Sequence, residues 1–217
     1  RNNMDRVAPP PPTPSPPIPE QKPEMHFSVP TQFVDLPSEG KYYPVGHPLH
    51  NKQTIEIKFM TAREEDILSS AALVRKGVVF DRLLQAVIVE NINPDDLLIG
   101  DKNAILVATR ITGYGTDYDT EVTCPACGNK SRFSFDLSDL STETHQFQAF
   151  ANVEPAKETG NGTFIINLPK LNAQVEIKPL CGHDEKRLGA ITQAKSRNNL
   201  AESLVTDTLK AYIVSVN

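Results

Sequence analysis

Two stretches of the sequence resemble each other, and this internal repeat limits the possible folds more than any other feature. Residues 54–68, TIEIKFMTAREEDIL, align without a gap with residues 174–188, QVEIKPLCGHDEKRL. Each stretch begins with alternating apolar and polar residues, as in a strand, and continues into a segment with helix-capping residues. The alignment therefore predicts an α+β fold built from a duplicated unit, in which a strand is followed by helices.

The first copy of this unit carries signals for three helices. A helix over residues 61–77 is predicted because Thr61 and Glu64 match a capping box. A second helix is predicted around Leu84, where apolar residues recur at spacings of three and four. Asp101 is expected to cap a third helix, which is predicted to end at Gly113.

The second copy repeats the strand and the first two helices. Helices are predicted over residues 183–195 and 199–216, and residues 208–216 resemble residues 83–91 of the first copy. The sequence then ends at Asn217, so the third helix has no counterpart. The second repeat is therefore expected to be incomplete, and the natural protein is expected to continue.

Cys124 and Cys127 lie in a short loop between two strand-like segments. A Cys-x-x-Cys-Gly loop can place two thiolates on one metal ion, and a structural zinc ion takes four ligands. The sequence therefore predicts a zinc-knuckle β-hairpin over residues 121–137. Zinc is the predicted structural cofactor, with Cys124 and Cys127 as two of its ligands.

The other two ligands have several candidate sources. Cys181 and His183 are chemically competent, but the repeat aligns them with Thr61, a helix cap, and with Arg63 in the first helical turn. A second Cys-x-x-Cys beyond the end of the sequence is favoured, and a thiol pair without metal is the third possibility. A redox role is disfavoured because a strand follows the motif, whereas redox-active pairs lie at helix N-termini.

Proline sets the organisation of the N-terminus, since ten of the eighteen prolines fall within the first thirty residues. Proline fixes φ and lacks an N–H, so residues 1–26 are predicted to be an extended arm or linker that is free to bind a neighbour. The predicted organisation continues with the first repeat over 27–140, a linker over 141–160 and the second repeat over 161–217.

Charge and composition argue against several function classes. The net charge is −5 and the Lys and Arg residues are scattered, whereas a nucleic-acid-binding protein shows a clustered basic face. No apolar run approaches the roughly 20 residues that a membrane helix needs. No histidine or carboxylate spacing indicates catalysis, so the chain is not expected to be an enzyme. Three cysteines, two of them in Cys-x-x-Cys, indicate a reducing compartment.

Several segments in combination resemble the baseplate hub or hub-assembly proteins of contractile-tailed (T-even-type) bacteriophages, the gene-26-like family. The resemblance covers residues 30–140 well and 170–217 more loosely, and the proline arm lies outside it. The segments are LPSEGKYYPVGHPL, IEIKFMTAREEDIL, LLIGDKNAILVATRITGYGTDYDTEVTCPACG and FSFDLS.

The resemblance implies a structural virion protein without enzymatic activity, located in the tail baseplate and assembled in the host cytoplasm. It implies a multimeric state and partners among other phage tail and baseplate proteins. It also implies a longer chain with a second Cys-x-x-Cys-Gly near its C-terminus. Cys181 departs from the small or hydroxyl residue that is usual at its position.

Two alternative functions stay open. The first is a zinc-ribbon module that binds nucleic acid or a polymerase. The charge of the hairpin argues against this function, because Lys130 and Arg132 are balanced by three acidic residues, Asp117, Asp119 and Glu121. The second alternative is a transient baseplate assembly chaperone.

Overall fold

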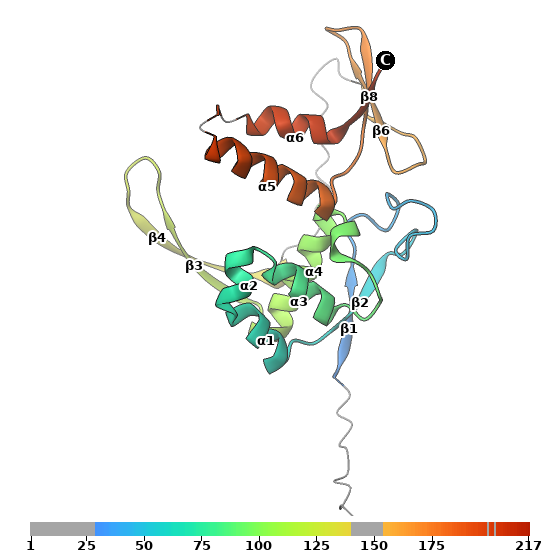
Figure 1. The fold of residues 1–217 in the computed structure, drawn as a ribbon. Coiled ribbons are helices and arrows are strands. Elements are labelled where there is room, and N and C mark those ends of the chain that lie inside the picture. Colours follow the sequence, from blue (N-terminus) through green and yellow to red (C-terminus); the bar gives the residue numbers. More distant parts are fainter. Residues whose placement is uncertain (1–28, 140–153, 199, 202) are drawn as a thin grey trace, which may run out of the picture.

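The computed structural model describes residues 29–139 and 154–217, except residues 199 and 202. It contains two strand-and-helix units and a long hairpin that extends from the first unit (Figure 1). The predicted arm over 1–26 and most of the predicted linker lie outside the described residues. The first unit consists of β1 (Thr31–Asp35), β2 (Thr54–Lys58), α1 (Ala62–Ser69), α2 (Ala71–Lys76), α3 (Val79–Val87), η1 (Pro94–Asp96) and α4 (Ile99–Tyr114).

The hairpin and the second unit follow in chain order. The hairpin consists of β3 (Asp117–Thr123) and β4 (Lys130–Asp136), followed by the short turn η2 (Leu137–Asp139). The second unit consists of β5 (Lys157–Glu158), β6 (Phe164–Leu168), β7 (Ala173–Ile177), α5 (Gly182–Arg197), α6 (Leu204–Tyr212) and β8 (Ile213–Val216). This mixture of antiparallel strands and helices agrees with the predicted α+β class.

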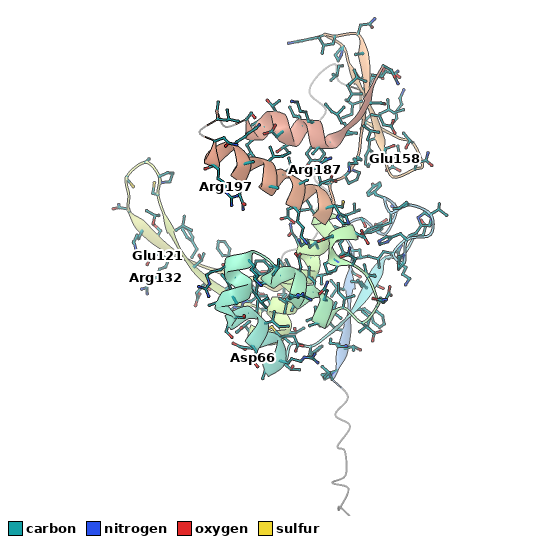
Figure 2. All side chains as sticks on the ribbon, in the orientation of Figure 1. Asp66, Glu121, Arg132, Glu158, Arg187 and Arg197 are labelled. Atoms are coloured by element: carbon teal, nitrogen blue, oxygen red, sulfur yellow. The ribbon has the colours of Figure 1, made fainter. Side chains whose placement is uncertain are left out.

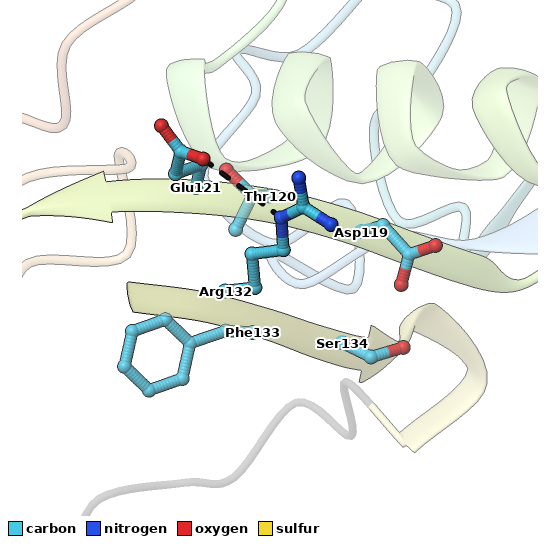
Figure 3. A pocket seen from close by; sticks show the side chains of 6 residues that line it. All are labelled: Asp119, Thr120, Glu121, Arg132, Phe133 and Ser134. Atoms are coloured by element: carbon cyan, nitrogen blue, oxygen red, sulfur yellow. Dashed lines mark ion pairs between the residues drawn. The ribbon is translucent and has the colours of Figure 1, made fainter. Parts of the chain in front are cut away.

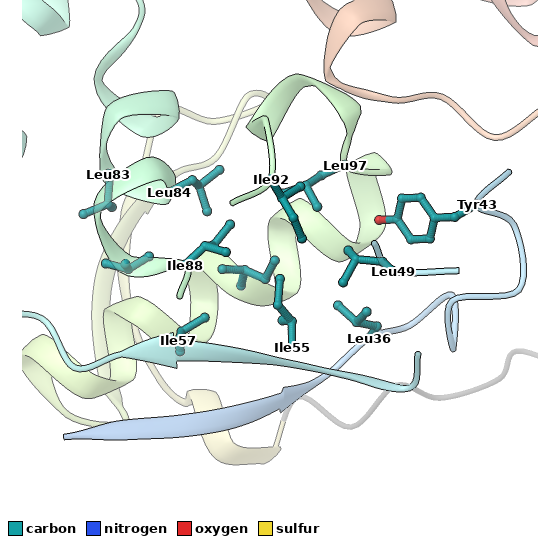
Figure 4. Packing of buried hydrophobic residues seen from close by; sticks show 12 residues of the cluster. Leu36, Tyr43, Leu49, Ile55, Ile57, Leu83, Leu84, Ile88, Ile92 and Leu97 are labelled. Carbon is teal, nitrogen blue, oxygen red and sulfur yellow. The ribbon is translucent and has the colours of Figure 1, made fainter. Parts of the chain in front are cut away.

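The main hydrophobic core lies in the first unit, between the β1–β2 pair and the helices (Figure 4). Ile55 and Ile57 alternate with polar residues on β2, and both are fully buried. Leu84 and Val87 of α3 and Ile105 of α4 are also fully buried against this sheet. The helix-period and strand-period patterns of the sequence thus place their apolar residues in one core.

The helix predicted over 61–77 is divided into α1 and α2. Ser70 lies between them in an extended conformation, with φ −68° and ψ 101°. Serine is a poor residue for a helix interior because its hydroxyl competes for backbone hydrogen bonds, and two serines occur together here. The predicted ends are confirmed, because Thr61 and Glu64 form the capping box and Gly77 terminates α2 in the left-handed region.

The prediction that Asp101 caps the third helix was wrong. Leu98 is the N-cap of α4, and Asp101 lies within its first turn. The predicted end at Gly113 was also wrong, since α4 includes Gly113 and has Gly115 as its C-cap. The buried Asp101 carboxylate accepts hydrogen bonds from the Ser38 N–H (3.0 Å), the Ser38 hydroxyl (2.6 Å) and the Tyr43 hydroxyl (2.7 Å). These contacts tie the long connection between β1 and β2 to α4. Burial, reinforced by the Asp101 charge, raises the pKa of Tyr43 well above its usual range.

The second unit contains a four-stranded antiparallel sheet in the order β5-β6-β7-β8. The predicted second helix stops at Tyr212, and Ile213–Val216 form β8 beside β7, where a continued helix was expected. The β-branched residues of this segment suit a strand, and the free edge of β7 supplies its hydrogen-bond partners. The strand β5 lies within the predicted linker 141–160, so the ordered second unit begins earlier than predicted.

The two aligned stretches occupy equivalent structural positions. Ile57 of β2 forms a bridge with Ile88, the residue that follows α3. In the second unit Ile177 of β7 pairs with Ile213, the residue that follows α6. In both units the strand therefore pairs with the residue that directly follows the second helix of the repeat.

A side-chain hydrogen bond also recurs between the units. The Thr31 hydroxyl donates to Glu56 at 2.6 Å, and the Thr163 hydroxyl donates to Glu176 at 2.7 Å. Glu56 and Glu176 are aligned in the sequence repeat, whereas Thr31 and Thr163 lie before the aligned stretches. The structural correspondence thus extends to the strand that precedes the aligned stretch.

The two units meet where the N-terminus of α5 lies against η1 and the start of α4. The Gly182 N–H donates to the Leu97 carbonyl, and the Ile99 N–H donates to the Leu180 carbonyl, both at 3.0 Å. A Cβ atom on Gly182 would lie only 2.8 Å from the Asp95 Cα. The approach of the two backbones therefore depends on glycine at this position.

Charged residues reinforce this contact. The Lys102 ammonium lies 2.9 Å from Glu185 and 3.4 Å from Asp81, while Lys186 lies 2.8 Å from Asp81 and 2.6 Å from Asp95. Burial raises the pKa of Asp81, but Lys186 and Lys102 outweigh that effect and hold it below its usual value. The ion pairs thus join α3, α4 and η1 to α5.

Candidate metal site and exposed apolar faces

The predicted Cys hairpin is present, and it is longer than the predicted 121–137. β3 and β4 pair in register from Asp117, opposite Asp136, to Thr123, opposite Lys130. The ladder continues into the turn, where the Cys124 N–H donates to the Asn129 carbonyl at 2.8 Å. Cys124 and Cys127 therefore lie at the tip, which extends away from the helices (Figure 1).

The turn itself has a shape that suits two metal-bound thiolates. Gly128 adopts the left-handed region, with φ 73°, and its N–H donates to the Cys124 carbonyl at 2.9 Å. The N–H groups of Cys127 and Ala126 donate to the Cys124 sulfur, which holds the pKa of that thiol below its usual value. Donors aimed at the sulfur stabilise a thiolate, the form that binds zinc. The residues present therefore fit two ligands of a tetrahedral zinc site.

Cys181 has a different role. It is the N-cap of α5, and the Asp184 carboxylate accepts from its N–H at 3.4 Å and lies 3.5 Å from its sulfur. Burial raises the pKa of Asp184, but the Lys178 ammonium and the Cys181 N–H hold it below its usual value. This is the cap position that the alignment with Thr61 indicated.

His183 is exposed in the first turn of α5, where its Nε2 lies 2.9 Å from Asp96 Oδ1. Within the described residues, no group of three or more His, Cys, Asp or Glu side chains is placed to hold a metal ion. The structure therefore does not bring Cys181 and His183 together with Cys124 and Cys127. Zinc stays a prediction, with its remaining ligands to be supplied from elsewhere.

The hairpin has one polar face. Along it the Glu121 carboxylate lies 2.8 Å from the Lys130 ammonium and 3.8 Å from the Arg132 guanidinium. Figure 3 shows the Arg132–Glu121 pair beside Asp119 at a shallow hollow of the hairpin, with the Phe133 ring directed away from Arg132. Figure 2 labels side chains of both charges on the hairpin and on the second unit, and an acidic one, Asp66, on α1. This distribution differs from the one-signed basic surface of nucleic-acid-binding proteins.

The opposite face of the hairpin is apolar and exposed. Its large side chains, which are 42–50% exposed, are Tyr118, Val122, Phe133 and Phe135. Sequence reasoning noted that the strands alternate but did not identify this face. The alternation of aromatic and polar residues over residues 131–136 was the available signal.

A second exposed apolar face lies on α6 and β8. Leu209 is 55% exposed, whereas its counterpart Leu84 in the first unit is fully buried. Tyr212 is 37% exposed, whereas its counterpart Val87 is fully buried. Other exposed apolar residues of this face are Leu204, Val205, Ile213, Val214 and Val216. Sequence reasoning assigned residues 199–216 to a helix and did not identify this exposed face.

The first unit shows what covers Leu84 and Val87, the counterparts of Leu209 and Tyr212. There α4 packs against α3 and β1, and Ile105 of α4 belongs to the same buried cluster as Leu84 and Val87. In the part of the chain that the structure describes, no counterpart of α4 packs on α6. The face of α6 thus has the composition of a core surface but lacks its cover.

None of the described helices has both the length and the apolar character needed to cross a lipid bilayer. No curated protein and no solved structure shows a significant match to this chain. A family model described as "T4 bacteriophage base plate protein" matches residues 29–158, which include the first unit, the hairpin and β5. Since the match spans more than half of the 217 residues, the chain belongs to the T4 bacteriophage base plate protein family and is a component of a phage tail baseplate.

Proposed function

We propose that this chain is a hub or hub-proximal structural component of a contractile-tail baseplate and acts through protein–protein assembly. Family membership supports the location in the tail. The observation that carries the mode of action is the exposure of Leu209, Tyr212 and Ile213, whose counterparts in the first unit, Leu84, Val87 and Ile88, are buried. An apolar face of this extent marks an interaction site rather than an ordinary surface.

The first unit indicates the chemistry of the partner. Its equivalent face is covered by α4, an amphipathic helix that places Ile105 in the core and partly buries Leu106 and Ala108. We therefore assign to the α6–β8 face a helix of the same kind, offered by a neighbouring baseplate protein. If the third helix expected in a longer chain covered this face instead, Leu209→Glu would lower the denaturation midpoint of the full-length chain. An apolar helix laid into an apolar groove is a common mode of protein recognition.

Structural roles for the buried charged groups support assembly rather than catalysis. Asp101 holds the β1–β2 connection, and Lys102 joins α3 to α5. Glu64 and Asp184 complete helix caps. Each of these groups is engaged by partners within the fold, whereas a catalytic acid or base must reach a substrate.

The test is complementation of a phage that lacks the gene for this chain. Leu209→Glu places a charge on the α6 face, so we expect its incorporation into purified baseplates to fall about tenfold or more. Lys210→Glu, at an exposed position of α6 outside the stripe of Val205, Leu209 and Tyr212, is the matched control and should be incorporated like the unchanged chain. Both variants should keep the denaturation midpoint of the isolated chain, because both side chains are exposed.

Normal incorporation of Leu209→Glu would contradict the proposed use of this face. Retention of the chain in mature tails supports a permanent component, whereas its loss after assembly would favour the transient chaperone. Cross-links from the chain to proteins on the tail axis would support the hub position, and cross-links confined to the baseplate periphery would contradict it. Salt-sensitive binding to DNA or RNA at low ionic strength would favour the zinc-ribbon module instead.

A further inference from the structure

The β3–β4 hairpin lacks the support that such hairpins need. In the described part of the chain its strands pair with each other, and no third strand joins them. An isolated two-stranded hairpin is at best marginally stable in water and usually gains stability from further strands or from packing on one face. The hairpin nevertheless extends away from the rest of the fold in Figure 1.

The register shows which face is available for packing. Tyr118 lies opposite Phe135, and Thr120 lies opposite Phe133. Side chains directly opposite one another lie on the same face of a sheet, and alternate residues of a strand share that face. The aromatic residues therefore form one continuous surface.

Cys124 belongs to this apolar face. It follows Val122 by two positions, and its N–H donates to the Asn129 carbonyl as the next rung of the ladder. Alternation thus places Cys124 at the tip end of the apolar surface, with Cys127 exposed in the adjoining turn. A partner that covers the apolar surface would also reach the two sulfurs.

We propose that the hairpins of two copies of this chain pack through their apolar faces, and that Cys124 and Cys127 of both copies bind one structural zinc ion. Each copy provides the same apolar surface and the same two thiols, so a two-fold axis makes both sets self-complementary. The four sulfurs complete the tetrahedral coordination that structural zinc takes. Zinc binding releases the thiol protons to the solvent.

The pairing also accounts for the stability of the hairpin. Burial of the aromatic faces between two sheets removes the apolar surface from water, and the metal fixes the turns. The polar faces, with Glu121, Lys130 and Arg132, stay outside in the solvent.

The test is native mass spectrometry combined with zinc analysis on the 217-residue chain purified with zinc. We expect a dimer that holds one zinc ion per two chains. Cys124→Ser and Cys127→Ser should each lose the zinc and weaken dimerisation by about tenfold or more. Cys181→Ser is the control and should keep both the zinc and the dimer, since Cys181 caps α5.

A second variant tests the apolar face without changing the thiols. Phe133→Ser combined with Phe135→Ser should weaken the dimer while circular dichroism shows that the helices persist. A cobalt-substituted dimer should show the absorption of a tetrahedral tetrathiolate site, and the serine variants should not. One zinc per monomer, a dimer that is indifferent to the cysteine substitutions, or a chain that binds no zinc would each overturn the proposal.

Discussion

The two strand-and-helix units share a backbone path but differ in how far their apolar residues are buried. In the first unit the residues after the strand enter a closed core, and Leu84 is fully buried. In the second unit the aligned Leu209 is 55% exposed. The same local sequence pattern therefore forms the same elements in both units, while the surroundings decide whether the apolar stripe becomes core or surface.

The connections between the elements account for this difference. Residues 36–53 join β1 to β2 and contribute Leu36, Tyr43 and Leu49 to the core of the first unit. Residues 169–172 join β6 to β7, and this connection is too short to cover a helix. The first unit also has α4, which Asp101 fastens to the long connection. Closure of a core thus depends on segments outside the repeat.

The largest contrast is expected between Leu84→Ala and Leu209→Ala. Removing the buried Leu84 side chain leaves a cavity and should lower the free energy of unfolding by about 2–5 kcal/mol. Leu209→Ala should change it by no more than about 0.5 kcal/mol, because the side chain is largely in water. Urea denaturation of both variants, followed by circular dichroism, measures the two effects. Equal losses would show that α6 is as well covered as α3.

The next effect concerns the contact between the units. Gly182→Ala would place a Cβ atom 2.8 Å from the Asp95 Cα, so the backbones must move apart. We expect a loss of about 1–3 kcal/mol, the usual cost of overpacking. Gly189→Ala is the matched control in the same helix, since nothing lies near its Cβ position. It should instead stabilise α5 by about 0.5–1 kcal/mol. A neutral Gly182→Ala would mean that the units can separate freely.

The two helix caps should respond differently to pH and salt. Asp184 has a lowered pKa, so its stabilising contribution is present above its unfolded-state value of about 3.9 and disappears as pH falls through the folded-state pKa. The stability difference between the unchanged chain and Asp184→Asn should therefore be constant near neutral pH and shrink in acid. Added salt should also reduce it, because Lys178 lies 2.8 Å away.

Glu64→Gln is the comparison for the first unit. Burial raises the pKa of Glu64, but hydrogen bonds from the Thr61 hydroxyl and N–H hold it below its usual value. The stability difference between the unchanged chain and Glu64→Gln should therefore also shrink in acid. Salt should matter less than for Asp184, because the main partners of Glu64 are neutral. Unfolding measured over a pH and salt grid gives both comparisons, and equal salt sensitivity would contradict the assigned partners.

The smallest effect is expected from exchanging the caps. Cys181→Thr gives α5 the cap residue of α1, whose hydroxyl accepts from the Arg63 N–H at 3.3 Å. A hydroxyl is a better acceptor than a thiol, so we expect a gain of about 0.5 kcal/mol. Thr61→Cys should cost a similar amount. Thermal denaturation compares the two variants, and a loss of stability in Cys181→Thr would point to a further role for the thiol.

Much of the candidate site followed from local sequence. The Cys hairpin, the cap position of Cys181 and the helix ends at Thr61 and Gly77 depend on neighbouring residues, and all of them are present in the structure. Asp101 was misassigned because its partners, Ser38 and Tyr43, lie about sixty positions away in the sequence. The zinc ion and the hub position are still predictions.

By itself, the sequence determined the element types, the repeat and the Cys turn, because hydrophobic periodicity, capping residues and turn glycines act over a few residues. Only the tertiary structure decided that Ile213–Val216 pair with β7 as a strand, since this needs the free edge of a distant strand. The tertiary structure also decided which apolar stripes are buried. Burial depends on what packs over a helix, and that cover comes from segments far away in the chain.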